Sequence, residues 1–318
     1  MQTGTRPRPA VPAVVADGRA TGRRGRAVGM ALMLSSSLGS QTGAAIGALA
    51  FPMIGPVGVV AVRQWVAGVI LLAVGRPRLR SFTRQQWLPV LGLAAVFATM
   101  NVSLYTAIDR VGLGLAVTLE FLGPLSVALV GAWTVTPPGI RRRITLACAL
   151  LAGVGVLVLT RPQPTTDYVG VAMGMLAALC WAGYILLNRT LGRRLPGVEG
   201  AAAAGALSAL VYVPVGIIVL LAHPPTTAAL VYALAAGGLS SVVPFLADLL
   251  TLRRVPAHSF GIFMSLSPVF AATIGAAVLG EMLAAADWLA IGLIVSANAV
   301  AVFVTSTTAS HDAVVVPA

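Results

Sequence analysis

The chain has 318 residues, of which 58% are hydrophobic and 9% are charged, and its mean hydropathy is +0.93. Soluble domains carry about 25% charged residues, so this composition excludes a soluble enzyme or binding domain and indicates a polytopic membrane protein. The net charge of +12 is due to arginine, since the chain has no lysine. Most of these arginines lie in short segments between apolar runs, so we expect the bilayer, and no nucleic acid, as a partner.

The N-terminal segment 1–27 is rich in arginine, proline and glycine and is expected to be a disordered cytoplasmic tail. Its Arg23-Arg24 pair is similar to a twin-arginine signal, but the apolar stretch that follows is too long for the apolar part of a signal peptide. Only further apolar runs come after it, so we expect no cleaved export signal. Residues 307–318 are expected to form a cytoplasmic C-terminal tail.

Between the two tails, ten apolar segments of about 17–25 residues can be recognised, each long enough for one transmembrane helix. Irregular backbone is not tolerated in contact with lipid, so each segment is expected to be helical. The ten expected spans are 28–50, 57–75, 88–108, 111–133, 144–160, 168–190, 199–221, 227–251, 256–279 and 284–306.

Arginine is distributed unevenly between the two sides of this ten-span arrangement. With the N-terminus in the cytoplasm, 18 of the 21 arginines fall on the cytoplasmic side, whereas Arg110 and Arg161 fall outside and Arg63 lies within a span. Removing one span would scramble this alternation. The positive-inside rule therefore predicts an all-α protein of ten spans with both termini in the cytoplasm.

A weak internal repeat becomes visible when the chain is shifted by 144 residues. The fourth and ninth expected spans then correspond, which divides the chain into two units of five spans, 28–160 and 161–306. A unit with an odd number of spans must insert upside down the second time, and inverted repeats are the architecture of many secondary transporters. The matched residues are Arg110-Val111 with Arg254-Val255, Pro124 with Pro268, and Gly131-Ala132 with Gly275-Ala276.

Glu120 lies within the apolar fourth span, and Arg63 lies within the second. A carboxylate at the centre of a span costs about 2.5–3.5 kcal/mol on insertion scales, so a buried charge usually faces a cavity, a partner or a proton path. The pair can be interpreted in two ways. Glu120 binds an ammonium group or a proton while Arg63 binds a carboxylate, or the two form a fixed ion pair that only locks helices together.

Other polar residues of the spans are candidates for the same site. Gln41, Asn101, Tyr184 and Ser265 are expected to donate or accept hydrogen bonds there, and Asp248 is a possible second proton site, although an interfacial carboxylate is an equally good interpretation. No metal or cofactor is expected, because the cysteines and histidines have no ligand spacing. Residues that could line a cavity are Tyr105, Trp181, Ser240, Ser241 and Ser267.

The glycines Gly39, Gly43 and Gly47 form a GxxxGxxxG stripe on the first span. Such a stripe allows the backbones of two helices to approach closely, so we expect it to be a packing surface. Gln41 is about 200° away from its neighbouring glycines around a helix, so it is expected to face a different side together with Ser37.

Several of these segments resemble the drug/metabolite transporter superfamily, EamA type, over about residues 30–305. The resemblance implies a ten-span fold of two five-helix units in a bacterial inner or plasma membrane, and the proton-driven efflux of small metabolites. The segments that carry it are Gln41–Ala45, Met100-Asn101 with Tyr105, Gly114–Leu129, Cys180–Leu186, Arg254–Pro268 and Gly280-Glu281.

The expected function is export of a small neutral amino acid, such as threonine or homoserine, by proton antiport with alternating access. One alternative is a multidrug or other metabolite permease of the same superfamily. The alternatives of another class are a membrane-embedded enzyme, which should show a second convergent acid or metal ligands, and a scaffold that transports nothing. An enzyme is not expected, and a monomer and a homodimer are both left open.

Overall fold

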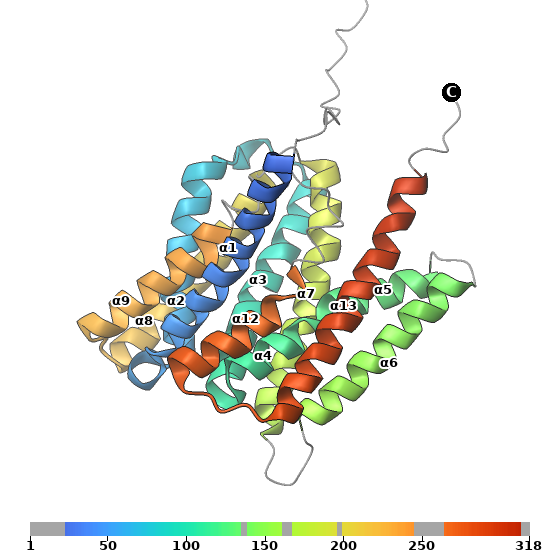
Figure 1. Cartoon of the computed structure of the whole chain (residues 1–318). Coiled ribbons are helices and arrows are strands. Elements are labelled where there is room, and N and C mark those ends of the chain that lie inside the picture. The colour runs from blue at the N-terminus through green and yellow to red at the C-terminus, as the bar shows by residue number, and fades with distance from the viewer. Residues whose placement is uncertain (1–22, 135–138, 161–166, 196–198, 245–263, 313–318) are drawn as a thin grey trace, which may run out of the picture.

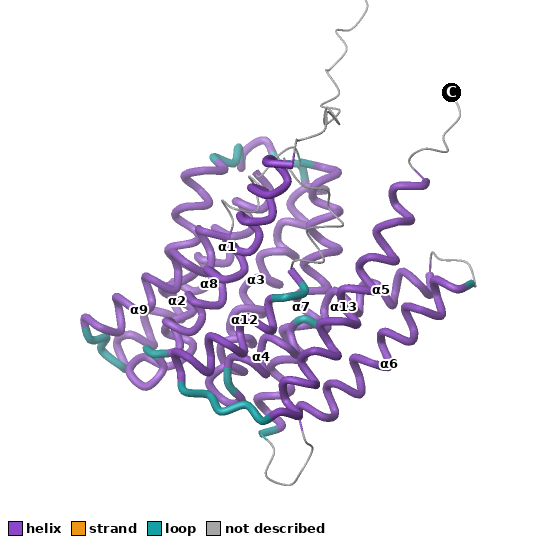
Figure 2. Tube along the Cα trace, in the orientation of Figure 1, coloured by secondary structure: helices purple, strands orange, loops and turns teal. Residues whose placement is uncertain are grey.

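The structure is a computed structural model, and it describes residues 23–134, 139–160, 167–195, 199–244 and 264–312. Within these residues the chain is almost entirely helical and contains no strand (Figures 1 and 2). The helices are α1 (Arg23–Ala48), α2 (Phe51–Gly75), α3 (Arg84–Val111), α4 (Leu113–Glu120), α5 (Leu122–Thr134), α6 (Ile140–Thr160), α7 (Tyr168–Arg194), α8 (Glu199–Ala222), α9 (Thr227–Gly237), α12 (Ser267–Ile274) and α13 (Ala285–Asp312), with the short turns η1 (Leu79–Ser81), η2 (Gly238–Val242) and η3 (Gly275–Leu279).

Six helical stretches of the described chain are long and apolar enough to cross a bilayer. Three further apolar helical stretches, which lie in 227–242, 267–279 and 285–301, are shorter. The chain is therefore a helical protein with six candidate membrane spans, and the count of ten spans stays a prediction. The six stretches are Phe51–Gly75, Arg84–Val111, Leu113–Gly131, Arg142–Thr160, Tyr168–Gly192 and Glu199–Ala222.

Large apolar side chains cover the outside of the helices. Leu150, Ile218 and Leu221 are 73%, 67% and 76% exposed. In water, so much exposed apolar surface would cause the protein to aggregate. In a bilayer these side chains contact lipid, and helices associate instead through close packing and polar contacts. α3 packs along α7, α2 along α8, and α6 along α13.

The expected fourth span is broken into two helices directly after Glu120. α4 ends at Glu120, Phe121 forms a turn, and α5 begins at Leu122. Pro124 has no N–H and therefore cannot bond to the carbonyl of Glu120, which favours a break at this point. In the described part of the ninth expected span, a turn at 265–266 precedes α12, and Pro268 is the second residue of that helix.

The glycine stripe of α1 packs against α9 and η2, as the spacing predicts. A Cβ added to Gly47 would lie 3.0 Å from the Cβ of Ala236, and one added to Gly43 would lie 2.4 Å from the Oγ of Ser240. At Gly39 the nearest atom, on Val243, would be 3.4 Å away, which is an ordinary contact. The backbones are therefore closest at Gly43, beside a residue of the cavity described below.

Gly43→Ala should destabilise the protein by about 1–3 kcal/mol, because the added methyl group would overlap both the backbone and the side chain of Ser240. Gly39→Ala is the matched control on the same stripe, and its melting temperature in detergent should stay near that of the wild type. Equal melting temperatures for the two variants would contradict the close approach of α1 and η2.

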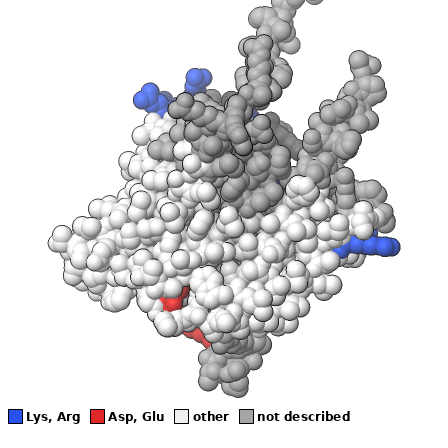
Figure 3. Space-filling model, viewed as in Figure 1, with Lys and Arg blue, Asp and Glu red and all other residues white. Residues whose placement is uncertain are grey.

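Charge is concentrated at the ends of the helices. Figure 3 shows arginine at the upper edge of the molecule and at the outer end of the α5–α6 pair, whereas acidic atoms lie at the lower edge. The start of α1 and the end of α13 both lie at the upper edge in Figure 1. The described ends of the chain thus share the arginine-rich side.

At the lower end, Asp167 begins α7 and joins it to α3. Its carboxylate accepts a hydrogen bond of 2.8 Å from the N–H of Gly170, and it lies 3.1 Å from Nη1 of Arg110. The Gly170 N–H foremost, with the Arg110 guanidinium, holds the pKa of this carboxyl below its ordinary value. Capping by a carboxylate at a helix start is favourable because it satisfies a free N–H and complements the helix dipole.

Asp167→Ala should lower the melting temperature at neutral pH, and the difference from the wild type should shrink in acid. A lowered pKa in the folded state stabilises the protein above the unfolded pKa, and this contribution is lost as pH falls through the folded pKa. Melting curves at pH 7, 5 and 3.5 measure it, with the exposed Asp109→Ala as the control. A difference that is constant with pH would contradict the assignment.

Candidate functional site: a polar cavity among the helices

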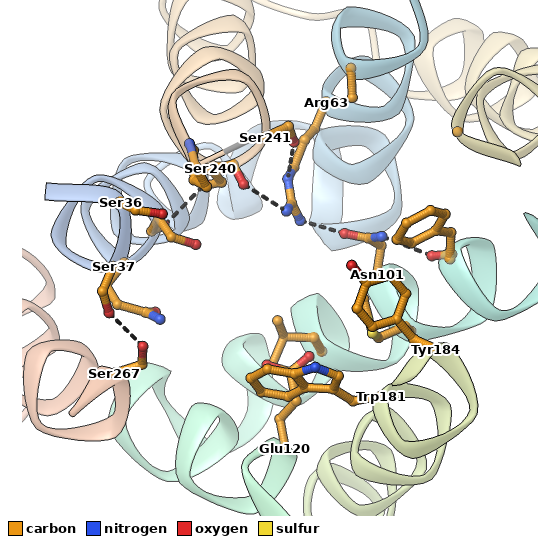
Figure 4. Close-up of a pocket in the computed structure, with 18 of the residues that line it drawn as sticks. Ser36, Ser37, Arg63, Asn101, Glu120, Trp181, Tyr184, Ser240, Ser241 and Ser267 are labelled. Atoms are coloured by element: carbon orange, nitrogen blue, oxygen red, sulfur yellow. Dashed lines mark hydrogen bonds between the residues drawn. The ribbon is translucent and has the colours of Figure 1, made fainter. Parts of the chain in front are cut away.

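A cavity of about 320 Å³ lies among α1, α2, α3, α4, α7 and η2. This volume is at the lower end of the range of small-molecule sites, about 300–1,000 Å³. Side chains from widely separated parts of the chain meet at it (Figure 4). Nine of the residues singled out from the sequence line its wall, namely Gln41, Arg63, Asn101, Glu120, Trp181, Tyr184, Ser240, Ser241 and Ser267.

Arg63 is fixed on one side of the cavity by contacts with two other elements, α3 and η2. Its Nη1 donates to Oδ1 of Asn101 at 2.5 Å, its Nε donates to Oγ of Ser241 at 3.2 Å, and its Nη2 donates to the carbonyl of Ser240 at 3.5 Å. Its Cζ lies 5.0 Å from the centre of the Tyr105 ring, which is a cation–π distance. Asn101 is itself held, because its Nδ2 donates to the carbonyl of Phe97 at 2.8 Å. The guanidinium is thus oriented by neutral groups.

Glu120 lies across the cavity from Arg63 and points into it (Figure 4). Its side chain is buried, with 7% of its surface exposed. Within the described residues Glu120 has no hydrogen bond and no ion pair. The ion pair of the described residues joins Arg110 and Asp167, away from the cavity. The fixed Arg63–Glu120 pair that the sequence left open is therefore not formed, and both charges face the same space.

Hydroxyl groups line a third side of the cavity. Ser36, Ser37 and Ser40 of α1 face Ser240 of η2 and Ser267 of α12. Ser37 and Ser267 are hydrogen-bonded to each other, and Oγ of Ser240 donates to the carbonyl of Ser40 at 3.0 Å. The cavity therefore offers neutral donors and acceptors between its two charges.

Aromatic rings form the side next to Glu120. The Trp181 ring meets the Phe121 ring edge to face, with centres 4.4 Å apart, and the Phe97 and Tyr184 rings are 5.4 Å apart. Pairs at these distances stabilise each other and keep their orientation. This side is a rigid apolar surface.

Two candidates from the sequence lie away from the cavity wall, and a third falls outside the described residues. Tyr105 is fully buried behind Arg63 and its hydroxyl has no hydrogen-bond partner among the described residues, and Ser265 is buried in the turn before α12. Neither residue is part of the cavity wall. Asp248 lies outside the described residues, so its relation to the cavity stays a prediction.

Other wall residues were not singled out from the sequence, among them Ser36, Ser40, Gln64, Phe97 and Phe121. Serine within an apolar helix carries little signal, since its hydroxyl can bond to the backbone of its own helix. Gln64 had a signal that could have been used, because it is a polar residue next to Arg63 in an apolar span. Its Nε2 donates to Oγ of Ser208 at 2.6 Å, which joins α2 to α8.

The described residues contain no cluster of three histidine, cysteine or acidic side chains that could hold a metal ion. Among its described wall residues the cavity carries one carboxylate, one guanidinium and neutral polar groups. Such a set can bind a small polar solute and exchange a proton.

Comparison with known proteins decides the family. The EamA-like transporter family matches residues 168–303. The threonine/homoserine exporter RhtA of Escherichia coli K12 is 33% identical over 270 residues, which cover 84% of this chain and 88% of that protein. The chain belongs to the EamA-like transporter family. It is a multi-pass bacterial membrane protein, and transporters rather than enzymes are its named relatives.

Further relatives agree with this membership. The RhtA protein of Salmonella typhimurium LT2 is 33% identical over 261 residues, which cover 81% of this chain and 85% of that one. The uncharacterized transporter YwfM of Bacillus subtilis is 26% identical over 226 residues, covering 70% and 76%. One crystal structure resembles the chain with a TM-score of 0.58 and 20% identity, covering 87% of this chain and 97% of that one, which shows a common fold alone.

Proposed function

We propose that this protein exports a small neutral amino acid, such as threonine or homoserine, in exchange for protons. The observation that carries the proposal is one cavity of about 320 Å³ in which Glu120, a carboxylate with no partner among the described residues, faces a fixed guanidinium, Arg63. A zwitterion complements both charges at once, with its ammonium near Glu120 and its carboxylate near Arg63. The RhtA relatives, which are named as threonine/homoserine exporters, support this choice of substrate.

In the proposed cycle, Glu120 binds either the substrate ammonium or a proton, never both. Substrate enters from the cytoplasm when Glu120 is charged. After the substrate is released to the outside, a proton from the outside binds to the Glu120 carboxylate in its place. A carboxylate without a fixed partner suits this exchange, because no ion pair has to be broken first. Arg63, held by Asn101 and Ser241, orients the substrate carboxylate. Gln41, Tyr184 and the serine hydroxyls contribute hydrogen bonds to the substrate.

We further propose that ten spans form two inverted units, 28–160 and 161–306, which rock about the cavity with both termini in the cytoplasm. Turns shortly before Pro124 and Pro268 support two equivalent units, and both described chain ends lie on the arginine-rich side. Such breaks near the substrate site are typical of inverted-repeat transporters.

Single cysteines introduced at Thr226 and Arg142 test this orientation. In a background without Cys148 and Cys180, an impermeant maleimide added to whole cells should label position 226 and leave position 142 unlabelled. Both sites should react after the membrane is permeabilised, which controls for access. The reverse pattern in whole cells would contradict the proposed topology.

The proposed substrate is tested with purified protein in liposomes. In liposomes whose transporters have their cytoplasmic side facing the bath, labelled threonine or homoserine should accumulate in the lumen when the lumen is more acidic than the bath. Collapse of the pH gradient should stop this accumulation. Unlabelled neutral amino acids should compete, whereas acidic and dibasic ones should not. Absence of gradient-driven accumulation for the whole neutral panel would contradict the proposal.

A second candidate function is export of a larger, amphiphilic molecule. The aromatic surface of Trp181, Phe121, Phe97 and Tyr184 favours it, because such a surface binds apolar groups. Competition separates the two functions. If aromatic amphiphiles inhibit threonine transport at lower concentrations than threonine itself, the aromatic substrate is preferred.

A further inference from the structure

The start of α4 is held by a carboxylate from the C-terminal part of the chain. Glu281 follows η3, and its Oε1 accepts a hydrogen bond of 2.6 Å from the N–H of Leu113 while its Oε2 accepts one of 3.2 Å from the N–H of Gly114. The two segments are 168 residues apart in sequence. The first N–H groups of a helix have no partner within it, and a carboxylate there also complements the helix dipole.

Two glycines leave the room that this carboxylate occupies. A Cβ on Gly112 would lie 3.0 Å from Cδ of Glu281, and a Cβ on Gly275 would lie 2.4 Å from its Oε2. Gly112 also has a φ of 85°, which L-residues with a side chain rarely adopt. Leu113 and Gly114 are buried, and the Glu281 carboxylate covers their N–H groups. The niche fits Glu281 closely.

Glu120 is the last residue of the same helix. α4 is eight residues long, or about 12 Å, and it is broken from α5 at Phe121. Its position is therefore set mainly at its start and along its sides, where Gly114 packs on Ala272 and Leu119 packs on Gly174. A helix this short is not stable by itself, so its N-terminal contacts matter.

We propose that Glu281 is a positioning residue for Glu120: it fixes the start of α4 and so sets where the cavity carboxylate stands. Glu281 does not line the cavity and touches no substrate there. The inference rests on the proposed function only for its effect on transport, because the environment of Glu120 can be measured without any substrate.

The experiment measures the reaction of Glu120 with a fluorescent hydrophobic carbodiimide, which attacks protonated carboxyl groups, as a function of pH. Peptide mass mapping assigns the label to Glu120. The variants are Glu281→Gln, which keeps an acceptor oxygen, Glu281→Ala, which removes it, and Gly275→Ala, which displaces the carboxylate without removing it. Gly275 has a φ of −57°, so alanine fits its backbone.

Two control variants separate positioning from ordinary stability. Asp287→Ala removes another capping carboxylate, which accepts from the N–H of Ala284 at 2.8 Å at the start of α13. Gly292→Ala adds a methyl group on α13 where nothing lies within 4 Å. Neither residue is part of the cavity wall.

The midpoint of the Glu120 labelling profile should move by about one pH unit in Glu281→Ala and Gly275→Ala, and less in Glu281→Gln. It should stay at the wild-type value in both controls. Threonine binding should weaken about tenfold in Glu281→Ala, with Glu281→Gln between it and the wild type.

A purely structural role gives a different result. Melting temperatures would then fall in Glu281→Ala and Asp287→Ala alike, while the Glu120 profile and the threonine affinity stayed unchanged, and this would overturn the proposal. If Glu281→Ala does not fold, the Glu120 labelling profile and the threonine affinity of Gly275→Ala and Glu281→Gln test the proposal instead. If the wild type binds no threonine, the proposed function fails, and the labelling profile alone still tests the positioning.

Discussion

Glu120→Gln is expected to abolish the accumulation of threonine that a proton gradient drives, while the protein still folds. In the proposed cycle the protonated carboxyl holds no substrate, so exchange of labelled for unlabelled threonine should be lost as well. Glutamine has nearly the same shape as a protonated glutamate, so it keeps the packing beside Trp181 and Phe121 but cannot lose a proton. Because Glu120 has no hydrogen bond or ion pair in the described residues, no structural partner is left behind by the change. The measurement is uptake and counterflow in liposomes with equal amounts of protein.

Asp248→Asn is the control for this result, since Asp248 is the other carboxylate that the sequence proposes for the proton. It should accumulate threonine at the wild-type level. If Glu120→Gln accumulates threonine normally and Asp248→Asn does not, the proton site is Asp248 and the assignment of Glu120 is wrong.

Arg63→Met is expected to weaken threonine binding at least about 30-fold. Removing one partner of a buried, hydrogen-bonded charge pair costs about 2 kcal/mol or more, and a factor of ten corresponds to about 1.4 kcal/mol. Methionine keeps much of the volume beside Tyr105, but it leaves Asn101 and Ser241 without their donor. Arg63→Lys should be intermediate, because lysine keeps the charge and lacks the fork of donors that holds the guanidinium. Binding is measured by calorimetry in detergent.

The double variant Arg63→Met with Glu120→Gln distinguishes a binding site from a structural pair. A fixed ion pair would be replaced by two neutral side chains, so activity and melting temperature should recover. The structure has no such pair, and the double variant is expected to fold but to stay inactive. Near-normal efflux by the double variant would show that neither charge handles the substrate.

The sequence identified the two charges of the cavity because they break an apolar pattern. A charged glutamate or arginine within a span is costly to expose to lipid, so both were expected to face a cavity or a partner. Glu120 and Arg63 do face a common cavity. The same argument found Asn101 and Gln41. It could not show that Arg63 is held by Asn101 and Ser241 rather than by Glu120, because that choice depends on how helices rotate when they pack.

Contacts between distant segments were the main feature that the sequence could not provide. Gly280-Glu281 was noted only as part of the family resemblance, yet the structure shows Glu281 bound to the start of α4. No local pattern predicts a bond between residues so far apart. The serines Ser36 and Ser40 were missed for a different reason, since a serine in an apolar helix has the same sequence pattern whether it faces lipid, a neighbour or a cavity.

Helix boundaries were predicted least well near proline. The segment 51–56, with Pro52 and Pro56, was expected to link two spans, but α2 already begins at Phe51 and contains a kink at Gly55. Proline is tolerated in the first turn of a helix, where its missing N–H would have had no partner. At Pro124 and Pro268, which the shift of 144 residues matches, a turn directly precedes the helix that contains the proline.

The most direct test of proton exchange at Glu120 is to record proton movement that the substrate itself drives. Liposomes that contain the protein and a pH-sensitive dye are given a threonine gradient with no initial pH difference. The wild type should move protons against the direction of threonine flux, Asp248→Asn should do the same, and Glu120→Gln should give no substrate-driven pH change. A substrate-driven pH change of wild-type size in Glu120→Gln would contradict the account.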